Sequence, residues 1–215
     1  MMKRTFLVLI LAWAMTGMAS AQSVKDFWLA MPDSVLSSVN RSMRAELVAA
    51  TAPAMKTEVK NVLEGTMVLD TLTSDFMAVR ISGASTMQIR RLTYKGDTIF
   101  CVVRTYMGPV ADSNVSLYDK AWGSMDMKHI YDGKCIKCVK KSLVEKPDTM
   151  TQQRFEEVKA MLDPMLVTAT LSATDVTITF TGAVDVLNNE EKKAVSAIFV
   201  KKTFKWDGKI FKKVI

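Results

Sequence analysis

The sequence predicts an α+β fold in which N-terminal helices pack on an antiparallel sheet. Three observations predict this class. Apolar residues recur at helical spacing up to about residue 62, short β-branched and aromatic stretches follow Gly65, and Gly or Asp lies at the breaks between them. After residue 21 the sequence has no second apolar span, low-complexity run or long proline-rich linker. We therefore expect a single domain over residues 22–215.

The first 21 residues have the pattern of a secretory signal peptide. A basic start at Lys3 and Arg4 precedes a short apolar stretch, and Ala-Ser-Ala at 19–21 gives a small-x-small cleavage pattern before Gln22. The apolar stretch is too short for an ordinary membrane-spanning helix. A lipoprotein would need cysteine in place of Gln22. We therefore expect cleavage after residue 21, no membrane span in the rest of the chain, and a location in the periplasm or envelope of a Gram-negative bacterium.

The chain is basic, with 29 Lys and Arg against 22 Asp and Glu and a formal net charge of +7. Cleavage of the signal peptide, which has two basic and no acidic residues, lowers this charge by two. A basic exported protein is suited to anionic glycans, anionic lipid head groups or acidic partner proteins, unless its lysines form only a solvated surface. Export argues against nucleic acid as a partner. The sequence does not indicate an oligomeric state.

The N-terminal region is expected to form helices. Pro32 ends a first short helix, and Asp33 or Ser34 begins a second one whose apolar residues recur at helical spacing. The helical pattern resumes after Pro53 and ends near residue 62. These apolar residues are expected to cover a sheet.

Four strands are expected next, the last two joined as a hairpin. The stretch 95–97, Lys-Gly-Asp, is the expected turn, because glycine tolerates the positive φ of tight hairpin turns. In the second strand Phe76, Ala78 and Arg80 are expected on one face of the sheet. The predicted strands are residues 67–72, 76–81, 86–94 and 98–106.

A similar order returns in the second half of the chain. A helix is predicted over 152–162, followed by strands at 166–171, 176–181, 197–206 and 209–215. The stretches LTYKGDTIF and TFKWDGKIF resemble each other. One interpretation is a tandem of helix-plus-four-strand units, with halves 22–107 and 108–215. The other is two unrelated antiparallel meanders, because short β patterns resemble one another by chance. Both interpretations give the α+β class.

No catalytic motif is recognisable. The single histidine, His129, limits nucleophile–base pairs, and the chain has no Gly-x-Ser-x-Gly or Ser-x-x-Lys motif. Phosphate loops and dinucleotide fingerprints are also absent from the sequence, so we expect no cofactor and assign no catalytic residue. The sequence favours a binding protein over an enzyme. A hydrolase with a site assembled by the fold is one alternative.

A soft-metal site is the other alternative. In an extended strand Met125, Met127 and His129 would project from one face, and thioethers with an imidazole suit Cu(I). The competing interpretation is that these methionines fill an irregular core, as methionine commonly does, since methionines are spread along the whole chain.

The stretch GKCIKC contains two of the three cysteines, Cys135 and Cys138. We predict a strand here, in which these side chains point to opposite faces and lie too far apart for a disulfide. Three interpretations stay open: a bridge from Cys101 to one of the two, unpaired thiols, or a redox or metal role.

The C-terminal hairpin carries the candidate binding residues Lys202, Phe204, Trp206 and Lys209. Hairpins that combine aromatic residues with lysines can bind anionic sugars or proteins. The alternative is that the aromatic residues pack on helices while the lysines protect an edge strand from aggregation.

The sequence also resembles a known family. The stretches that carry the resemblance are DFWLAMPDSVL, LTSDFMAVRIS, STMQIRRL and CVVRTYMGPVADSNVSLYDKAW, together with the signal peptide. They resemble an uncharacterised domain-of-unknown-function family of secreted proteins from Bacteroidetes-type bacteria. The resemblance covers most of the chain and implies an envelope location but no activity. We therefore predict an exported, non-enzymatic protein that binds an envelope protein or a glycan through its sheet surface or C-terminal hairpin.

Overall fold

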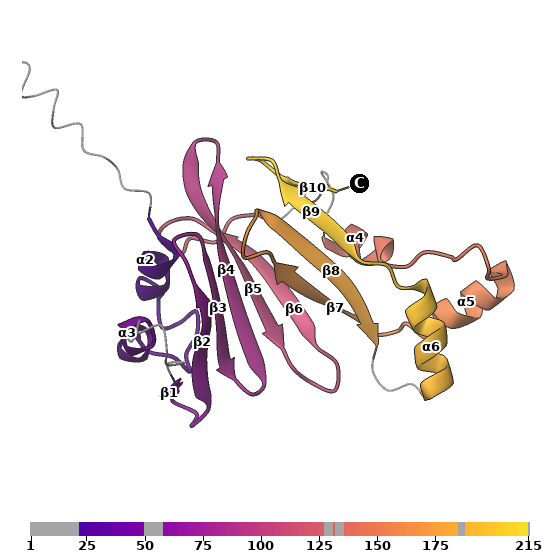
Figure 1. The fold of residues 1–215 in the computed structure, drawn as a ribbon, viewed down its shortest axis with the longest axis horizontal. Coiled ribbons are helices and arrows are strands. Elements are labelled where there is room, and N and C mark those ends of the chain that lie inside the picture. Colours follow the sequence, from indigo (N-terminus) through magenta and orange to yellow (C-terminus); the bar gives the residue numbers. More distant parts are fainter. Residues whose placement is uncertain (1–21, 50–57, 127–130, 132–135, 185–187, 215) are drawn as a thin grey trace, which may run out of the picture.

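The computed structural model describes residues 22–49, 58–126, 131, 136–184 and 188–214, and the side chains of 136–138 are excepted. Two short helices, α2 (Val24–Leu29) and α3 (Arg41–Ala49), cover one face of a six-stranded antiparallel sheet. A four-stranded antiparallel sheet and the later helices lie on its other side (Figure 1). The predicted α+β class is confirmed.

The six-stranded sheet is a meander in which each strand pairs with the next in sequence. Its strands are β1 (Glu58–Lys60), β2 (Thr66–Leu72), β3 (Phe76–Ser82), β4 (Ser85–Tyr94), β5 (Asp97–Tyr106) and β6 (Asp112–Tyr118). The predicted hairpin is present: Tyr94 pairs with Asp97, and both Lys95 and Gly96 have positive φ, as a two-residue turn of this kind requires.

The four-stranded sheet has the order β10-β9-β8-β7 and all its pairs are antiparallel. Its strands are β7 (Met165–Leu171), β8 (Thr177–Val184), β9 (Lys202–Trp206) and β10 (Phe211–Lys213), and the accompanying helices are α4 (Ile136–Ser142), α5 (Gln152–Ala160) and α6 (Asn189–Ile198). None of the helices in the described ranges is long and apolar enough to cross a membrane.

Side chains, not backbone pairing, join the edge strand β7 to the first sheet. Alternate N–H groups of β7 point toward that sheet and each donates to a side chain there. The bonds run from Val167 to Asp112 Oδ1 (3.0 Å), from Ala169 to Ser113 Oγ (3.0 Å) and from Leu171 to Gln88 Oε1 (2.9 Å). These bonds satisfy an edge that would otherwise be exposed to aggregation.

Two hydrophobic cores lie on opposite faces of the six-stranded sheet. The first core lies between the sheet and the helices α2 and α3. In it the ring of Phe27, from α2, is stacked between Phe100 (3.8 Å between ring centres) and Trp122 (3.9 Å). The second core lies on the other face, between this sheet and the four-stranded sheet. It includes Cys101 and the fully buried Tyr131. Aromatic rings are thus buried on both faces of this sheet, and their burial stabilises the packing of both layers against it.

Several predicted elements differ in the structure. The second helix begins at Arg41 because Asn40 Oδ1 accepts the Met43 N–H and caps it, and residues 58–60 form a strand and not a helix end. The predicted strand at 197–206 is divided between α6 and β9. Asn188 forms a capping box with Glu191, which favours the helix. The internal repeat of halves stays a prediction.

Candidate functional site

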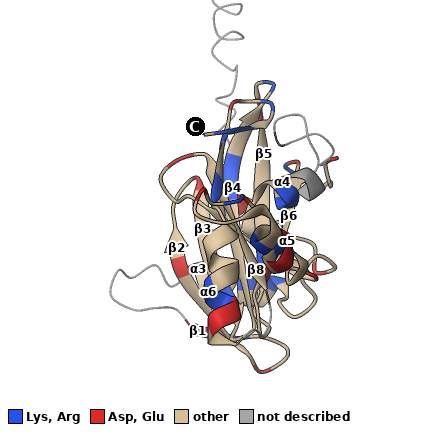
Figure 2. Cartoon of the chain, turned by 90° about the vertical axis from the view of Figure 1, so that its right-hand side faces the viewer, with Lys and Arg blue, Asp and Glu red and all other residues tan. Residues whose placement is uncertain are grey.

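Charged residues lie on the surface in small groups. In the view of Figure 2, basic residues on α4 lie beside α5, and both basic and acidic residues occur on α5 and α6. Because basic and acidic residues are mixed in this view, charge alone does not mark a binding site. We therefore looked for candidate sites among the hollows of the surface.

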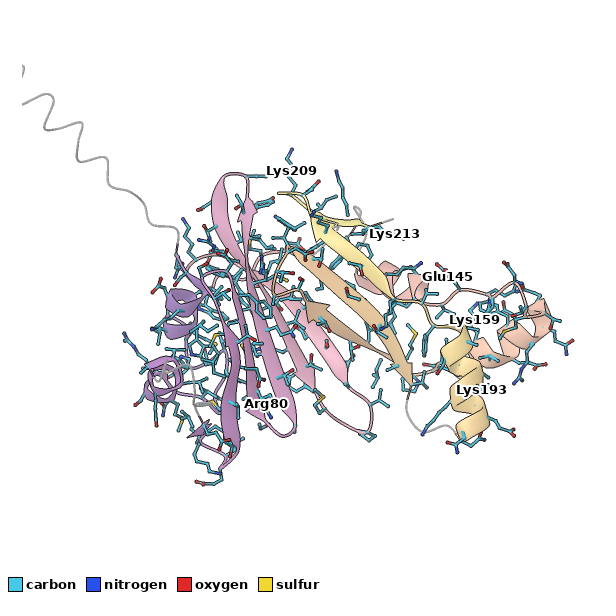
Figure 3. All side chains as sticks on the ribbon, viewed as in Figure 1. Arg80, Glu145, Lys159, Lys193, Lys209 and Lys213 are labelled. Carbon is cyan, nitrogen blue, oxygen red and sulfur yellow. The ribbon has the colours of Figure 1, made fainter. Side chains whose placement is uncertain are left out.

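The four candidate residues of the C-terminal hairpin do not share one surface. Phe204 and Trp206 are buried, with exposed fractions of 4% and 6%, and belong to the second core. Lys202 forms an ion pair with Glu145, whereas Lys209 is exposed at the hairpin tip (Figure 3). The two aromatic rings are therefore almost fully covered within the core, and a binding role for the four hairpin residues stays a prediction.

The candidate soft-metal residues fall mostly outside the described ranges. Met125 is half-buried against the second core, and its N–H donates to the Leu117 carbonyl (2.9 Å). Met127 and His129 lie outside the described residues. In the part of the chain that the structure describes, no group of three or more His, Cys, Asp and Glu residues could hold a metal ion. A Cu(I) site stays a prediction.

The cysteines also separate. Cys101 is free and fully buried, and burial raises the pKa of its thiol to about 12, so it is not a thiolate nucleophile at neutral pH. Cys135 and the side chain of Cys138 lie outside the described residues, but residue 138 belongs to α4. The predicted strand is therefore wrong here. Val139 and Leu143, one helical turn apart, are both buried, which favours a helix.

A small hollow lies on the face of β5 and β6 that also packs against α2 and Trp122. It adjoins that packed region. We call it the arginine hollow. Its volume is about 230 Å³, and it is lined by Val102, Arg104, Tyr106, Asn114, Ser116 and Tyr118. The lining residues lie on one face because Arg104 pairs with Asn114 and Val102 pairs with Ser116 across the two strands.

Arg104 is the charged group of the arginine hollow. Its Nη2 nitrogen is buried and has no hydrogen-bond partner among the described residues. On one side Tyr118 packs on Trp122 at 5.0 Å between ring centres, and Tyr106 is 55% exposed. Ser116 Oγ donates to Asn114 Oδ1, which leaves the amide nitrogen of Asn114 as a donor. The hollow thus combines a cation, two phenol rings and small polar groups.

A larger groove lies between α4, α5 and the start of β7. We call it the lysine groove. Its volume is about 770 Å³, and it is lined by Lys140, Lys141, Val144, Phe155, Lys159, Leu162, Asp163 and Met165. Lys159 extends over the Phe155 ring (5.6 Å to its centre) and pairs with Glu156 (3.3 Å). Lys140 and Lys141 are exposed and have no ion-pair partner among the residues that the structure describes.

Fold and geometry together define an α+β domain with two candidate binding sites. The chain belongs to the family described as "Protein of unknown function (DUF3256)", whose model matches residues 16–211. It is similar to a solved structure of a domain of an uncharacterized protein from Porphyromonas gingivalis W83, with 22% identity and a TM-score of 0.74, over 91% of this chain and 100% of that chain.

The similarity to that structure shows the fold alone. The predicted resemblance to a domain-of-unknown-function family is confirmed, and Porphyromonas gingivalis is a member of the Bacteroidetes. No curated protein matches the chain. The function must therefore be argued from the two candidate sites.

Proposed function

We propose that this chain is an exported binding protein, and that its ligand is an anionic glycan held in the arginine hollow. The proposal specifies one of the surfaces that the sequence suggested, the sheet face, and one of the ligands, a glycan. It rests on one observation above all, the buried Nη2 nitrogen of Arg104 that lacks a hydrogen-bond partner.

A buried donor without a partner costs free energy, and a ligand that supplies an acceptor removes that cost. The guanidinium of Arg104 presents parallel N–H groups that match the two oxygens of a carboxylate. A carboxylate-bearing sugar would therefore bind with its charged group against Arg104.

The rest of the arginine hollow suits a sugar ring. Tyr106 and Tyr118 offer apolar ring surface with a polar tip, and Asn114 and Ser116 offer partners for hydroxyl groups. The volume of about 230 Å³ is smaller than the roughly 300–1,000 Å³ of pockets that enclose a whole small ligand. We therefore expect one uronic-acid residue in the hollow and the rest of the oligosaccharide along the sheet face.

Titration calorimetry with an oligogalacturonate tests the binding site. The purified protein should bind this probe and bind its methyl-esterified, uncharged form much more weakly. Arg104→Gln should raise Kd at least tenfold, because hydrogen bonds to charged groups contribute about 1.5–3 kcal/mol and 1.4 kcal/mol is a tenfold change.

Arg80→Gln is the matched control. Arg80 lies on the opposite face of the same sheet, where it pairs with Asp70 at 3.1 Å (Figure 3). This variant should bind the probe as the unchanged protein does. Equal affinity for the charged and uncharged probes, or equal affinity in Arg104→Gln, would contradict the proposed site.

Export is the second part of the proposal, and the N-terminal pattern supports it. Ser23 caps the first helix and forms a capping box with Asp26, so cleavage after residue 21 removes no described element. Protein isolated from the periplasmic fraction should have the mass of a chain that begins at Gln22. Ala19→Arg should retain the signal peptide, because the cleavage site needs small residues. An intact N-terminus in the unchanged protein would overturn the proposed export.

A further inference from the structure

The lysine groove has an apolar floor. Phe155 and Leu162 come from the α5 region, Val144 follows α4, and Met165 begins β7. Leu162 and Met165 are each 7% exposed, and Phe155 and Val144 are half-buried against the second core. Hydrocarbon placed in the groove would therefore cover mainly the exposed parts of Phe155 and Val144, because Leu162 and Met165 are already almost fully covered.

The rim of the lysine groove is cationic. Three lysines and one carboxylate, that of Asp163, line it. Glu156 neutralises part of the charge of Lys159, whereas Lys140 and Lys141 have no ion-pair partner in the described ranges. Adjacent like charges without counter-charges are complementary to an anionic head group.

These two features select one class of occupant. We infer that the lysine groove binds an anionic amphiphile with one hydrocarbon chain, the chain lying on Phe155, Leu162 and Met165 and the anion lying between the lysines. The volume of about 770 Å³ is within the range of small-ligand pockets.

A series of straight-chain carboxylates tests this site. Octanoate, decanoate and dodecanoate, each below its micelle concentration, are titrated into the purified protein. Each added methylene that the floor covers should lower Kd about fourfold. Dodecanol, which has the same chain but no charge, should bind at least tenfold more weakly than dodecanoate.

Two pairs of substitutions separate the site from general basicity. Lys140→Gln with Lys141→Gln should weaken dodecanoate binding about tenfold. The matched control is Lys192→Gln with Lys193→Gln, which removes two adjacent exposed lysines of α6 that do not line the groove. Lys193 is labelled in Figure 3. All four lysines are exposed, so both variants should fold, and unchanged thermal unfolding verifies this.

The outcomes of these titrations are distinct. Dodecyl phosphate serves as a second head group: binding of both anions assigns the site to anionic amphiphiles generally, and binding of one identifies its head group. Arg104→Gln should leave dodecanoate binding unchanged, so the two binding proposals are tested independently. Absence of binding, equal binding of dodecanol, or equal weakening by the two lysine pairs would overturn the inference.

Discussion

Replacing Arg44 with alanine should lower the free energy of unfolding by about 3–5 kcal/mol, because it leaves buried hydrogen-bond acceptors without donors and opens a cavity. The Arg44 side chain is almost fully buried beneath the segment that joins α2 to α3. Its Nη1 donates to Asp33 Oδ1 (2.8 Å) and to the Val39 carbonyl (2.7 Å), and its Nη2 donates to the Met31 carbonyl (2.5 Å).

The size of this effect follows from what alanine leaves behind. Two backbone carbonyls of the connecting segment lose their donors, and each unsatisfied buried group costs about 1–3 kcal/mol. A cavity adds to this cost. Guanidinium chloride unfolding monitored by fluorescence measures the change. The tryptophans Trp28 and Trp122 lie in the adjacent core and serve as probes.

Arg41→Ala is the control, because Arg41 is exposed at the start of the same helix. It should change the free energy of unfolding by no more than about 0.5 kcal/mol. Arg44→Met should still destabilise the protein, because methionine fills the space but donates no hydrogen bond. A loss below about 1 kcal/mol in Arg44→Ala would show that Arg44 does not hold the connecting segment.

The role of Arg44 was not predictable from the sequence. The helical spacing predicted apolar residues such as Leu47, which is buried, but no apolar pattern indicated that Arg44 is buried on the same helix. A buried arginine is also indistinguishable from a solvated one in a single sequence. Only the three-dimensional path of the connecting segment supplies its partners.

Strands β2 to β5 were predictable because each is rich in β-branched and aromatic residues and bounded by turn residues, whereas β1 was predicted as the end of a helix. β6 was missed, because its Asp-Ser-Asn start is polar and only Leu117 in it is buried. The arginine hollow needs Asn114, Ser116 and Tyr118 from β6 beside Arg104 of β5. The arginine hollow could therefore not be predicted from the sequence, because one of its two strands was not predicted.

The lysine groove was hidden for a different reason. It requires α4, α5 and β7 to lie together, and the sequence predicted a strand at α4. Charge at Lys140 and Lys141 was visible in the sequence, but nothing local showed that Phe155 and Met165 would lie beside it. Sites between elements distant in sequence depend on packing that no single-sequence pattern encodes.

Trp206→Ala should lower the free energy of unfolding by about 3–5 kcal/mol, as large-to-small core substitutions of tryptophan do. The Trp206 ring contacts Phe211 (5.0 Å between ring centres) and Tyr94 (6.2 Å), and its Nε1 donates to the Thr93 carbonyl (2.7 Å). These contacts tie the C-terminal hairpin to β4 in the other sheet. Denaturant unfolding measures the loss.

Two further variants decide between the interpretations of the hairpin. Trp206→Phe keeps an aromatic ring but loses the indole hydrogen bond, so it should lose about 1–3 kcal/mol, less than the alanine variant. Lys205→Ala changes an exposed neighbour and should lose no more than about 0.5 kcal/mol. If Trp206 were a ligand-binding residue without a core role, Trp206→Ala would unfold like the unchanged protein. A large loss instead means that the hairpin's aromatic residues join the two sheets, and that only its lysines are available to a partner.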